Sequence, residues 1–253
     1  MLKVDHVFLS FEGLKAVNDV SLQVEKGSVT ALIGPNGAGK TTLFNLIAGV
    51  YTPESGHIYL DGEEITGMRC FRICEKGIAR TYQVIKLFGG MTVLENVLVG
   101  MHSRLKAGFW QGIFRTKKVR QEEKAANEKA HALLQLMGLD EFASYPAASL
   151  AYGQQRRLEI ARALASDPKL LLLDEPAAGM NSTEKFELND RIRKIIQMGI
   201  TVLIVEHDMN MVMNIADKIY VINSGKNLAE GNSEEIANNP DVIEAYLGKG
   251  DLL

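Results

Sequence analysis

Polar and apolar residues alternate near the start of the chain. Residues 3–10 follow this pattern, which predicts a β-strand with Val4, His6 and Phe8 on one side. A second alternating run covers residues 20–25 and follows a turn. The two runs predict a β-rich N-terminal portion, which we expect to be antiparallel.

Glycine-containing turns separate the next predicted elements. Residues 28–33 form a strand pattern that runs into a glycine-rich loop, and a helix is predicted from Lys40 to the vicinity of Gly49. A further strand at residues 57–60 ends in the Asp-Gly turn of residues 61–62.

The middle of the chain, residues 91–166, is predicted to be mostly helical. Residues 119–137 carry an apolar stripe with helical spacing, and Gly138 follows where a C-terminal cap is expected. The stripe consists of Ala126, Ala130, Leu133, Leu134 and Met137. Residues 103–118 interrupt this pattern with a mixture of basic and aromatic side chains.

Strand and helix patterns alternate again in the last third of the chain. Residues 170–173 are continuously apolar, as in a strand buried on both faces. A helix at 183–198 and strands at 201–205 and 218–222 follow, and two short helices close the chain. This alternation predicts an α/β fold with a mostly parallel core sheet.

The composition is that of an ordinary globular protein. Of 253 residues, 46% are apolar and 23% are charged, which is enough to bury a core. The net charge of −3 gives no basic field for nucleic acid. We therefore expect one domain, residues 1–253, with a core at 1–90 and 167–253 and an inserted helical subdomain at 91–166.

The cysteines and the termini also constrain the class. Cys70 and Cys74 lie four residues apart in a predicted helix, where a disulfide would be strained, so reduced thiols of a cytosolic protein are expected. The N-terminal residues are too few and too polar for a signal peptide. No apolar stretch approaches the ~20 residues that span a bilayer. If the protein acts in transport, another chain must supply the path.

The loop after residues 28–33 fits the phosphate-binding pattern G-x-x-x-x-G-K-[ST]. Its residues are Gly34, Pro35, Asn36, Gly37, Ala38, Gly39, Lys40 and Thr41, followed by Thr42. Glycines let backbone N–H groups surround an anion, and the helix N-terminus adds partial positive charge. Lys40 is expected to reach the β- and γ-phosphates, and Thr41 to ligate Mg²⁺. The alternatives are a plain tight turn or a dinucleotide loop, which lacks its third small residue here.

An acidic pair ends the strand at 170–173. We expect Asp174 to hold Mg²⁺, directly or through water, and Glu175 to accept a proton from the attacking water. The alternative is an acidic pair that simply ends a strand at the surface. The phosphate loop earlier in the chain favours the catalytic interpretation.

Five further features follow along the chain: Phe11, Gln83 in Arg-Thr-Tyr-Gln, residues 150–154, residues 178–181 and His207. They occur in the order found in the ATP-binding subunits of ABC transporters, and the chain resembles that family over nearly its whole length. The resemblance implies that Phe11 lies against the adenine of ATP, although a core aromatic is the alternative. It also implies that Gln83 joins the Mg²⁺ site to the membrane partner and that His207 is the switch histidine.

The family's signature sequence is matched by Leu150, Ala151, Tyr152, Gly153 and Gln154. This segment opens an amphipathic helix whose free N–H groups can bind an anion. The resemblance implies that ATP is buried between Lys40 of one subunit and the Gly153 turn of another. ATP binding then closes the dimer, and hydrolysis reopens it.

Three residues depart from the family's commonest pattern. Ala151 and Tyr152 replace the Ser and Gly of the signature, so Ala151 offers no hydroxyl to phosphate and Tyr152 restricts the backbone. Asn181 replaces the usual Asp of the D-loop, and its alternative role is to cap the helix at 183–198.

Residues 150–162, residues 174–181 and the ending at 239–248 together resemble the branched-chain amino acid importers of bacteria and archaea. Residues 103–118 suit the larger of that family's two ATPase subunits. The resemblance implies a dimer with a homologous ATPase subunit, two transmembrane permease subunits and an extracytoplasmic amino-acid-binding protein, with this chain peripheral at the cytoplasmic face of the membrane. Within the site it implies a catalytic role for Glu175, His207 and Gln83, and metal ligation by Thr41, Gln83 and Asp174.

Two other functions stay open at this point. A soluble ABC ATPase of the iron–sulfur assembly type has a compatible length, and the ATPases of lipopolysaccharide exporters have this size and a similar tail. For residues 103–118 the alternatives are contact with lipid headgroups or permeases, or a solvated loop with its aromatic side chains on the helical subdomain.

Overall fold

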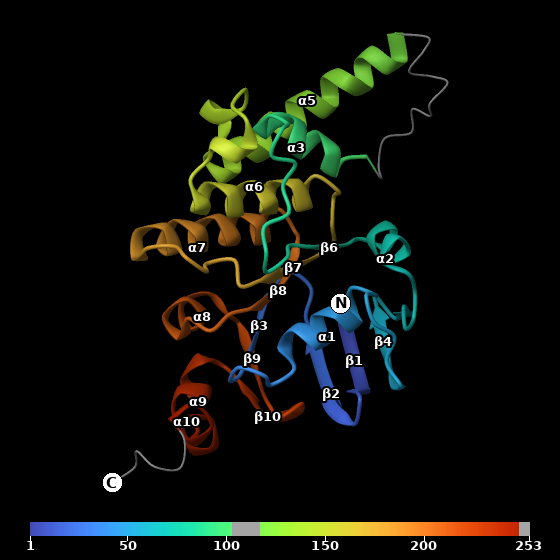
Figure 1. Ribbon diagram of the computed structural model, residues 1–253, viewed down its shortest axis with the longest axis vertical. Helices are drawn as coiled ribbons and strands as arrows, with labels where there is room; N and C mark the ends of the chain where they lie inside the picture. Colours follow the sequence, from blue (N-terminus) through green and yellow to red (C-terminus); the bar gives the residue numbers. More distant parts are fainter. Residues whose placement is uncertain (103–116, 248–253) are drawn as a thin grey trace. The chain divides into compact units, whose positions relative to one another are not determined.

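The computed structural model describes residues 1–102 and 117–247, which form two compact units (Figure 1). Unit 1 contains residues 1–80 and 169–176 and the chain from 195 onward. Unit 2 contains the chain from 81 to 168 together with residues 177–194. The expectations for the segment 103–116 and for the chain end after residue 247 lie outside the described residues.

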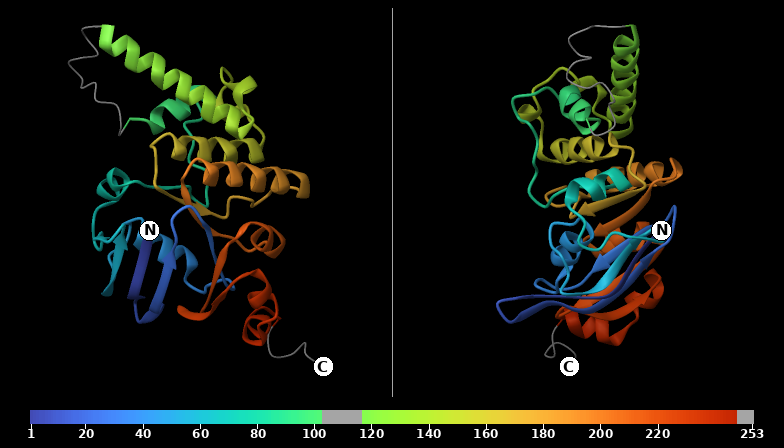
Figure 2. Two further views of the ribbon diagram at one scale, coloured as in Figure 1. Left: turned by 180° about the vertical axis from the view of Figure 1, so that it is seen from behind. Right: turned by 90° about the vertical axis from the view of Figure 1, so that its right-hand side faces the viewer.

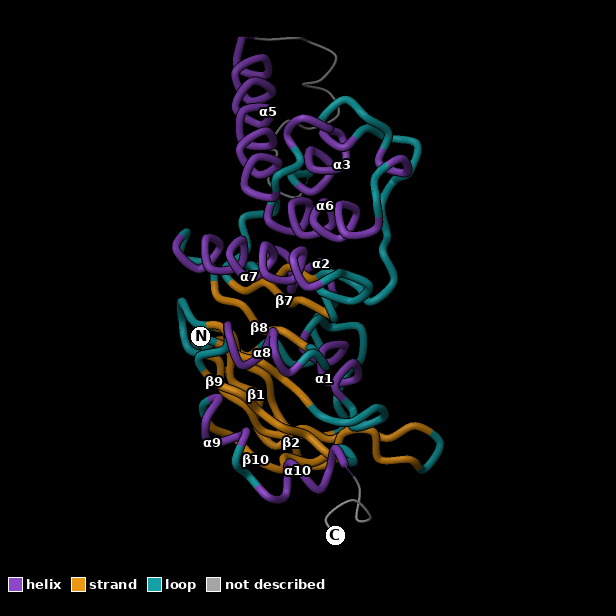
Figure 3. Tube along the Cα trace, turned by 90° about the vertical axis from the view of Figure 1, so that its left-hand side faces the viewer, coloured by secondary structure: helices purple, strands orange, loops and turns teal. Residues whose placement is uncertain are grey.

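The first sheet of unit 1 is antiparallel and has the strand order β2-β1-β4-β5. Its strands are β1 (Leu2–Phe11), β2 (Leu14–Val24), β4 (Ser55–Leu60) and β5 (Glu63–Glu64). Figure 3 shows strands β1 and β2 side by side. This sheet confirms the antiparallel N-terminal portion expected from the alternating runs. Its buried residues belong to one hydrophobic cluster with those of the helix after the phosphate loop.

Strand β1 contains an irregularity that the alternation pattern did not predict. His6 has a φ of 49°, and the pairing with β2 shifts register between Val4 and Val7. Val4 and Val7 are buried, whereas His6 is exposed and Phe8 only partly buried. The expectation that Val4, His6 and Phe8 share one side is therefore wrong, because a bulge changes the face to which the following side chains point.

The second sheet of unit 1 has the order β10-β9-β3-β8-β7-β6. All its neighbours pair in parallel except β10 with β9, which confirms the mostly parallel core sheet. The strands are β3 (Val29–Ile33), β6 (Ile78–Arg80), β7 (Leu170–Asp174), β8 (Thr201–Val205), β9 (Lys218–Asn223) and β10 (Lys226–Gly231). Every residue of β3, β7 and β8 is buried, as expected for central parallel strands.

The helices of unit 1 lie between or after its strands along the chain. They are α1 (Lys40–Ile47), α2 (Cys70–Lys76), α8 (Met209–Ile215), α9 (Ser233–Ala237) and α10 (Pro240–Leu247). Helix α1 buries Leu43, Phe44 and Ile47, which fixes the loop that precedes it. Helix α8 and strand β10 were not expected from the sequence.

Unit 2 is helical, and α3, α5 and α6 pack on one another (Figure 2). Its helices are α3 (Val93–Gly100), α5 (Lys117–Met137), α6 (Tyr152–Leu164) and most of α7 (Ser182–Gln197), with short 3-10 turns at Asp140–Phe142 and Ala147–Ser149. In α5 the expected stripe is buried from Ala130 to Met137. Gly138 follows with a φ of 63°, which confirms the left-handed cap.

Within the two described stretches, no helix combines the length and the apolar character needed to cross a membrane.

Candidate functional site

The predicted phosphate loop connects β3 to α1 in unit 1. Two of its glycines are required by close backbone contacts as well as by conformation. Gly34 has a φ of 151°, and a Cβ there would lie 2.0 Å from the Ile222 carbonyl oxygen. Gly39 has a φ of 100°, and a Cβ there would lie 2.3 Å from the Ala16 carbonyl oxygen. Only glycine fits either position.

Helix α1 begins directly behind this loop with unsatisfied backbone N–H groups. Among the described residues no side chain caps α1, and its first turn contains no acidic residue. Asn36, Gly37 and Thr41 are exposed around this terminus, and Thr42 is partly exposed. The N-terminus of α1 is therefore accessible to an anion, whose negative charge the helix dipole favours.

Lys40 folds back over the loop. Its Nζ donates hydrogen bonds to the carbonyl oxygens of Gly34, at 2.6 Å, and Pro35, at 2.9 Å. Burial lowers the pKa of Lys40, and the negative charges of Glu175 and Asp174 partly oppose this effect. A phosphate group at the loop would add further negative charge beside this buried ammonium group.

Asp174, at the end of β7, is completely buried and paired. Its Oδ2 lies 2.8 Å from Nη2 of Arg80, the last residue of β6. Nη1 of Arg80 donates to Oδ1 of Asn45 on α1, at 2.6 Å. Arg80 thus links the acidic strand end to the helix of the phosphate loop. The sequence interpretation missed Arg80, because it used the Arg-Thr-Tyr-Gln segment only for its glutamine.

Glu175 has an unusual backbone conformation next to Asp174. Its φ is 47°, uncommon for a residue with a side chain, and its N–H donates to the Val205 carbonyl oxygen at 2.9 Å. Glu175 Oε2 lies 4.0 Å from His207 Nδ1. Left-handed conformations of this kind cluster at functional sites, where the surrounding structure maintains them.

A second carboxylate, that of Glu206, adjoins His207. Glu206 is 1% exposed, and its Oε2 accepts the backbone N–H of His207 at 3.1 Å and lies 4.0 Å from Nδ1 of His207. The sequence interpretation did not select Glu206. The available signal was a carboxylate between a buried apolar strand and a candidate catalytic histidine.

Phe11 ends β1 at a turn and is 41% exposed. Its ring meets that of Tyr51 edge to face, with 5.2 Å between centroids. Phe11 therefore presents part of an aromatic surface to solvent, which differs from the core aromatic considered as the alternative.

The predicted signature lies at the start of α6 in unit 2. Ala151 precedes the helix, and its N–H donates to Oε1 of Gln154 at 2.9 Å. Leu150 is buried at 6% exposure and anchors the turn. Gly153 is also buried, and a Cβ there would lie 2.9 Å from Oε1 of Glu184. The turn is thus fixed by its own side chains and by α7.

The two remaining departures from the family's pattern have local explanations. Tyr152 lies against Gly179, where an added Cβ would meet the tyrosine Cε1 at 2.9 Å. Asn181 Oδ1 accepts the Glu184 N–H at 3.0 Å, and Glu184 Oε2 accepts the Asn181 N–H at 2.9 Å. This reciprocal pair is a capping box, so Asn181 does cap α7.

Gln83 lies in a segment of unit 2 without helix or strand and is exposed. Its carbonyl oxygen accepts a hydrogen bond from Arg156 of α6. The sequence interpretation missed this arginine, which reads along the chain as part of the polar face of a helix.

The site residues thus divide between the units. Unit 1 brings Lys40, Asp174, Glu175 and His207 together around the phosphate loop. Unit 2 carries Gln83, the signature and Asn181. The group of residues in unit 1 fits a triphosphate cradle with a proton acceptor beside it.

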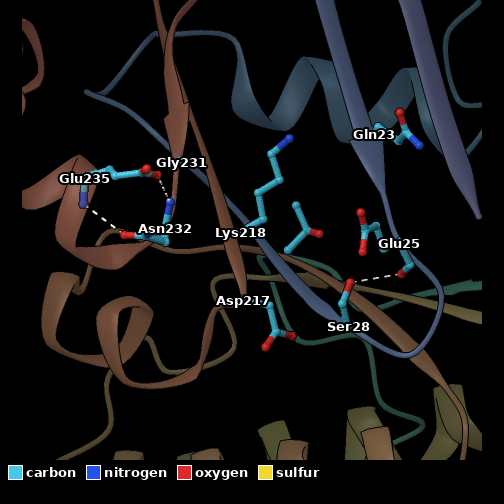
Figure 4. Close-up of a pocket in the computed structure, with 9 residues that line it drawn as sticks. Gln23, Glu25, Ser28, Asp217, Lys218, Gly231, Asn232 and Glu235 are labelled. Carbon is cyan, nitrogen blue, oxygen red and sulfur yellow. Dashed lines mark hydrogen bonds between the residues drawn. The ribbon is translucent and has the colours of Figure 1, made fainter.

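A separate concavity of about 310 Å³ in unit 1 contains none of these residues (Figure 4). Its lining is mixed in charge and includes Glu25, Asp217, Lys218 and Glu235. Two of these carboxylates bind nearby backbone groups. Asp217 Oδ2 accepts the Val29 N–H at 2.7 Å, and Glu235 Oε2 accepts the Asn232 N–H at 2.8 Å. The predicted site is therefore distinct from this concavity.

Comparisons with known proteins agree with the class that this geometry defines, a P-loop nucleotide-binding protein. The family model for "ABC transporter" matches residues 17–178, and that for "Branched-chain amino acid ATP-binding cassette transporter" matches residues 226–251. The chain is 50% identical, over 98% of both chains, to the "High-affinity branched-chain amino acid transport ATP-binding protein BraF" of Pseudomonas aeruginosa.

Solved structures show the same similarity. An ATP-binding cassette of an ABC transporter in its ADP conformation superposes with a TM-score of 0.86 at 34% identity, covering 98% of this chain and 99% of the other. A dimeric cassette bound to ADP and Pi gives 0.77 at 25% identity, covering 92% and 99%. The chain belongs to the ABC transporter ATP-binding family. It is an ATPase, and ATP is its nucleotide.

Proposed function

We propose that this chain is the ATP-hydrolysing motor subunit of an importer for branched-chain amino acids. The observation that carries the proposal is the phosphate loop with Lys40, placed beside the strand end that carries Asp174 and Glu175. The 50% identity to a branched-chain amino acid transport subunit along 98% of the chain supports the choice of cargo.

The proposed roles of the individual residues follow the family resemblance. Residues 34–42 bind the phosphates of ATP, and Phe11 stacks on the adenine. Glu175 accepts the proton of the attacking water, and His207 and Gln83 orient the groups that react. The nearness of His207 Nδ1 to Glu175 Oε2, at 4.0 Å, supports their cooperation.

Mg²⁺ fits the residues at this place. Mg²⁺ prefers oxygen ligands and is usually held by one or two carboxylates together with substrate phosphates and water. The Asp174 carboxylate and the accessible Thr41 hydroxyl provide such ligands, and we propose that Gln83 adds its amide oxygen. Among the described residues no cluster of three or more His, Cys, Asp or Glu could hold a metal. Bound Mg²⁺ would neutralise phosphate charge during transfer.

A second ATPase subunit completes the site in this proposal. Residues 150–154 bind the γ-phosphate of an ATP held by the partner subunit, through N–H groups at the start of α6. The commoner signature serine is Ala151 here, so backbone groups make this contact. ATP therefore closes the dimer and hydrolysis reopens it, as the similarity to a dimeric cassette supports.

The remaining parts of the proposed assembly lie outside this chain. The ATPase dimer binds two transmembrane permease subunits at the cytoplasmic face of the membrane, and an extracytoplasmic binding protein delivers the amino acid. Residues 1–253 form a single nucleotide-binding domain in this proposal. The bounds expected from the sequence, a core at 1–90 and 167–253 and a helical subdomain at 91–166, differ from the two units described above, in which residues 81–90 and 177–194 belong to unit 2.

Reconstitution of the co-purified assembly in proteoliposomes tests the proposal. Uptake of labelled leucine should require ATP on the side of this subunit, whereas labelled lysine should not accumulate. Glu175→Gln should retain ATP binding and lower hydrolysis about 100-fold or more, because a positioned base contributes roughly this factor. Rapid hydrolysis without leucine uptake, or purification with soluble assembly proteins only, would contradict the proposed importer.

A further inference from the structure

Arg156 is buried, which is unusual for an arginine. Its side chain is 2% exposed and is among the largest fully buried side chains of the described residues. It lies in the second turn of α6, four residues after Tyr152, and its guanidinium group lies 5.6 Å from the centre of the Tyr152 ring. Arg156 therefore contacts the signature from inside unit 2.

The same guanidinium group holds the backbone of the Gln83 segment. Nη1 donates to the Tyr82 carbonyl oxygen at 2.5 Å, and Nη2 donates to the Gln83 carbonyl oxygen. Residues 81–88 belong to no helix or strand, so groups outside a regular element bind their backbone. The planar fork of an arginine binds two adjacent carbonyl oxygens at once, which the single ammonium group of a lysine does less well.

Glu159 completes this contact from the next turn of α6. Its Oε2 lies 3.3 Å from Nη1 of Arg156, and its Oε1 accepts the Tyr82 N–H at 3.3 Å. Burial raises the pKa of Glu159, and hydrogen bonds from the backbone of Tyr82 and the charge of Arg156 oppose this effect. One buried ion pair thus binds both the N–H and the C=O of Tyr82, which fixes the orientation of that peptide segment.

The other end of the segment is also anchored within unit 2. Asn96 of α3 is fully buried; its Oδ1 accepts the Phe88 N–H at 2.9 Å, and its Nδ2 donates to the Phe88 carbonyl oxygen at 3.1 Å. Between these anchors Val84 is 72% exposed. The segment is therefore an exposed loop whose backbone is tied to α6 at one end and to α3 at the other.

We propose that Arg156 is a positioning residue that makes the backbone of Gln83 follow the signature helix α6. Engagement of the signature by a γ-phosphate then displaces Gln83 in the same step, because one guanidinium group binds the Gln83 carbonyl and contacts Tyr152. This inference rests on the proposed function, in which the signature binds ATP held by the partner subunit. It adds a physical connection between that event and Gln83.

Hydrogen exchange of the chain measured by mass spectrometry tests the connection. Arg156→Lys should raise exchange of the 82–86 amides about tenfold or more, because the loop then opens without global unfolding. The matched control is Arg72→Lys, which removes the guanidinium group of another i,i+3 pair, that of Arg72 and Glu75 on the surface of α2. The control should leave exchange at 82–86 unchanged.

The response to ATP separates positioning from simple stability. In a Glu175→Gln background with the homologous ATPase subunit present, ATP should protect residues 82–88 and 150–156 with one common midpoint. In the protein that also carries Arg156→Lys, ATP should still protect residues 150–156 from exchange. Protection of residues 82–88 should be lost or should require a higher ATP concentration. If both segments still respond together in that variant, the inference is wrong while the proposed function stands.

A different experimental result would contradict the proposed function itself. If ATP protects neither segment in the Glu175→Gln protein, the signature does not engage ATP, and the inference fails with it. Should Arg156→Lys not fold, as judged by its melting curve, the double variant Arg156→Gln/Glu159→Gln serves instead. It removes the guanidinium group together with the charge of its buried partner, and it should separate the two midpoints in the same direction; a common midpoint in this double variant would overturn the inference.

Discussion

The Arg80 guanidinium group lies 2.8 Å from the Asp174 carboxylate, and both side chains are almost completely buried. Breaking a buried ion pair on one side leaves an uncompensated charge, which costs far more than breaking an exposed pair. Arg80 also bonds Asn45, so the same residue fixes the acidic strand end and the helix of the phosphate loop relative to each other.

We therefore expect Arg80→Met to lower the free energy of unfolding by about 3–5 kcal/mol. Arg72→Met, at an exposed pair, should cost less than about 1 kcal/mol. Denaturant titration measures both values. The double variant Arg80→Met/Asp174→Asn should recover part of the loss, because it removes the charge left behind; an additive loss would contradict the pairing.

Glu206 is expected to act through His207. Because Glu206 accepts the backbone N–H of His207 and lies beside its ring, Glu206→Gln should lower kcat about tenfold and leave the KM for ATP nearly unchanged. Steady-state ATPase kinetics of the assembly give both constants. Adding Glu206→Gln to His207→Ala should cause no further loss, and a further tenfold loss would show that Glu206 acts independently of His207.

The pKa of His6 is raised, first by its hydrogen bond with Asp19 and then by the charge of Asp19. Because the folded-state pKa lies above the unfolded value of 6.5, the pair stabilises the fold fully below pH 6.5, and this contribution is lost as the pH rises through the folded-state pKa. NMR titration of the His6 ring should give a midpoint above 6.5. Asp19→Asn should lower it, and an unchanged midpoint would show that Asp19 is not the cause.

Glycine is favoured at position 179 both by the backbone conformation and by a close neighbour. Its φ is 75°, and a Cβ would meet the Tyr152 ring at 2.9 Å, whereas Gly199, with a φ of 85°, has no atom within 4 Å of its Cβ position among the described residues. Gly199→Ala should therefore cost about 1 kcal/mol from conformation alone. Gly179→Ala should cost more in denaturant melts, and Tyr152→Gly should remove the excess. Equal costs for the two glycine variants would show that the ring yields freely.

The elements whose conformation depends on residues close together in the chain could be predicted from the sequence. Residues 170–173 are apolar because both faces of a central strand are covered, and Gly34 and Gly39 indicate a loop in which a Cβ does not fit. Helix α5 could be predicted because its stripe has the period of a helix that is covered on one side.

The missed features depend on residues far apart in the chain. The bulge at His6 is stabilised by Ser21 and Asp19, so alternation within β1 alone gave the wrong face. Arg156 is buried by a loop more than 70 residues earlier, and Arg80 by a strand 94 residues later, as the separations of their bonded partners show. In a single sequence each of these residues looks like an ordinary surface charge.

Sedimentation velocity of the Glu175→Gln chain tests the central claim most directly, namely that ATP is held between the phosphate loop of one subunit and the signature of another. The chain is measured alone and with the homologous ATPase subunit, with and without ATP and Mg²⁺. We predict a monomer without nucleotide. With ATP we predict a dimer, formed by this chain alone or with the homologous subunit, and Lys40→Ala should abolish it. A protein that binds ATP yet stays monomeric both alone and with the homologous subunit would contradict the account.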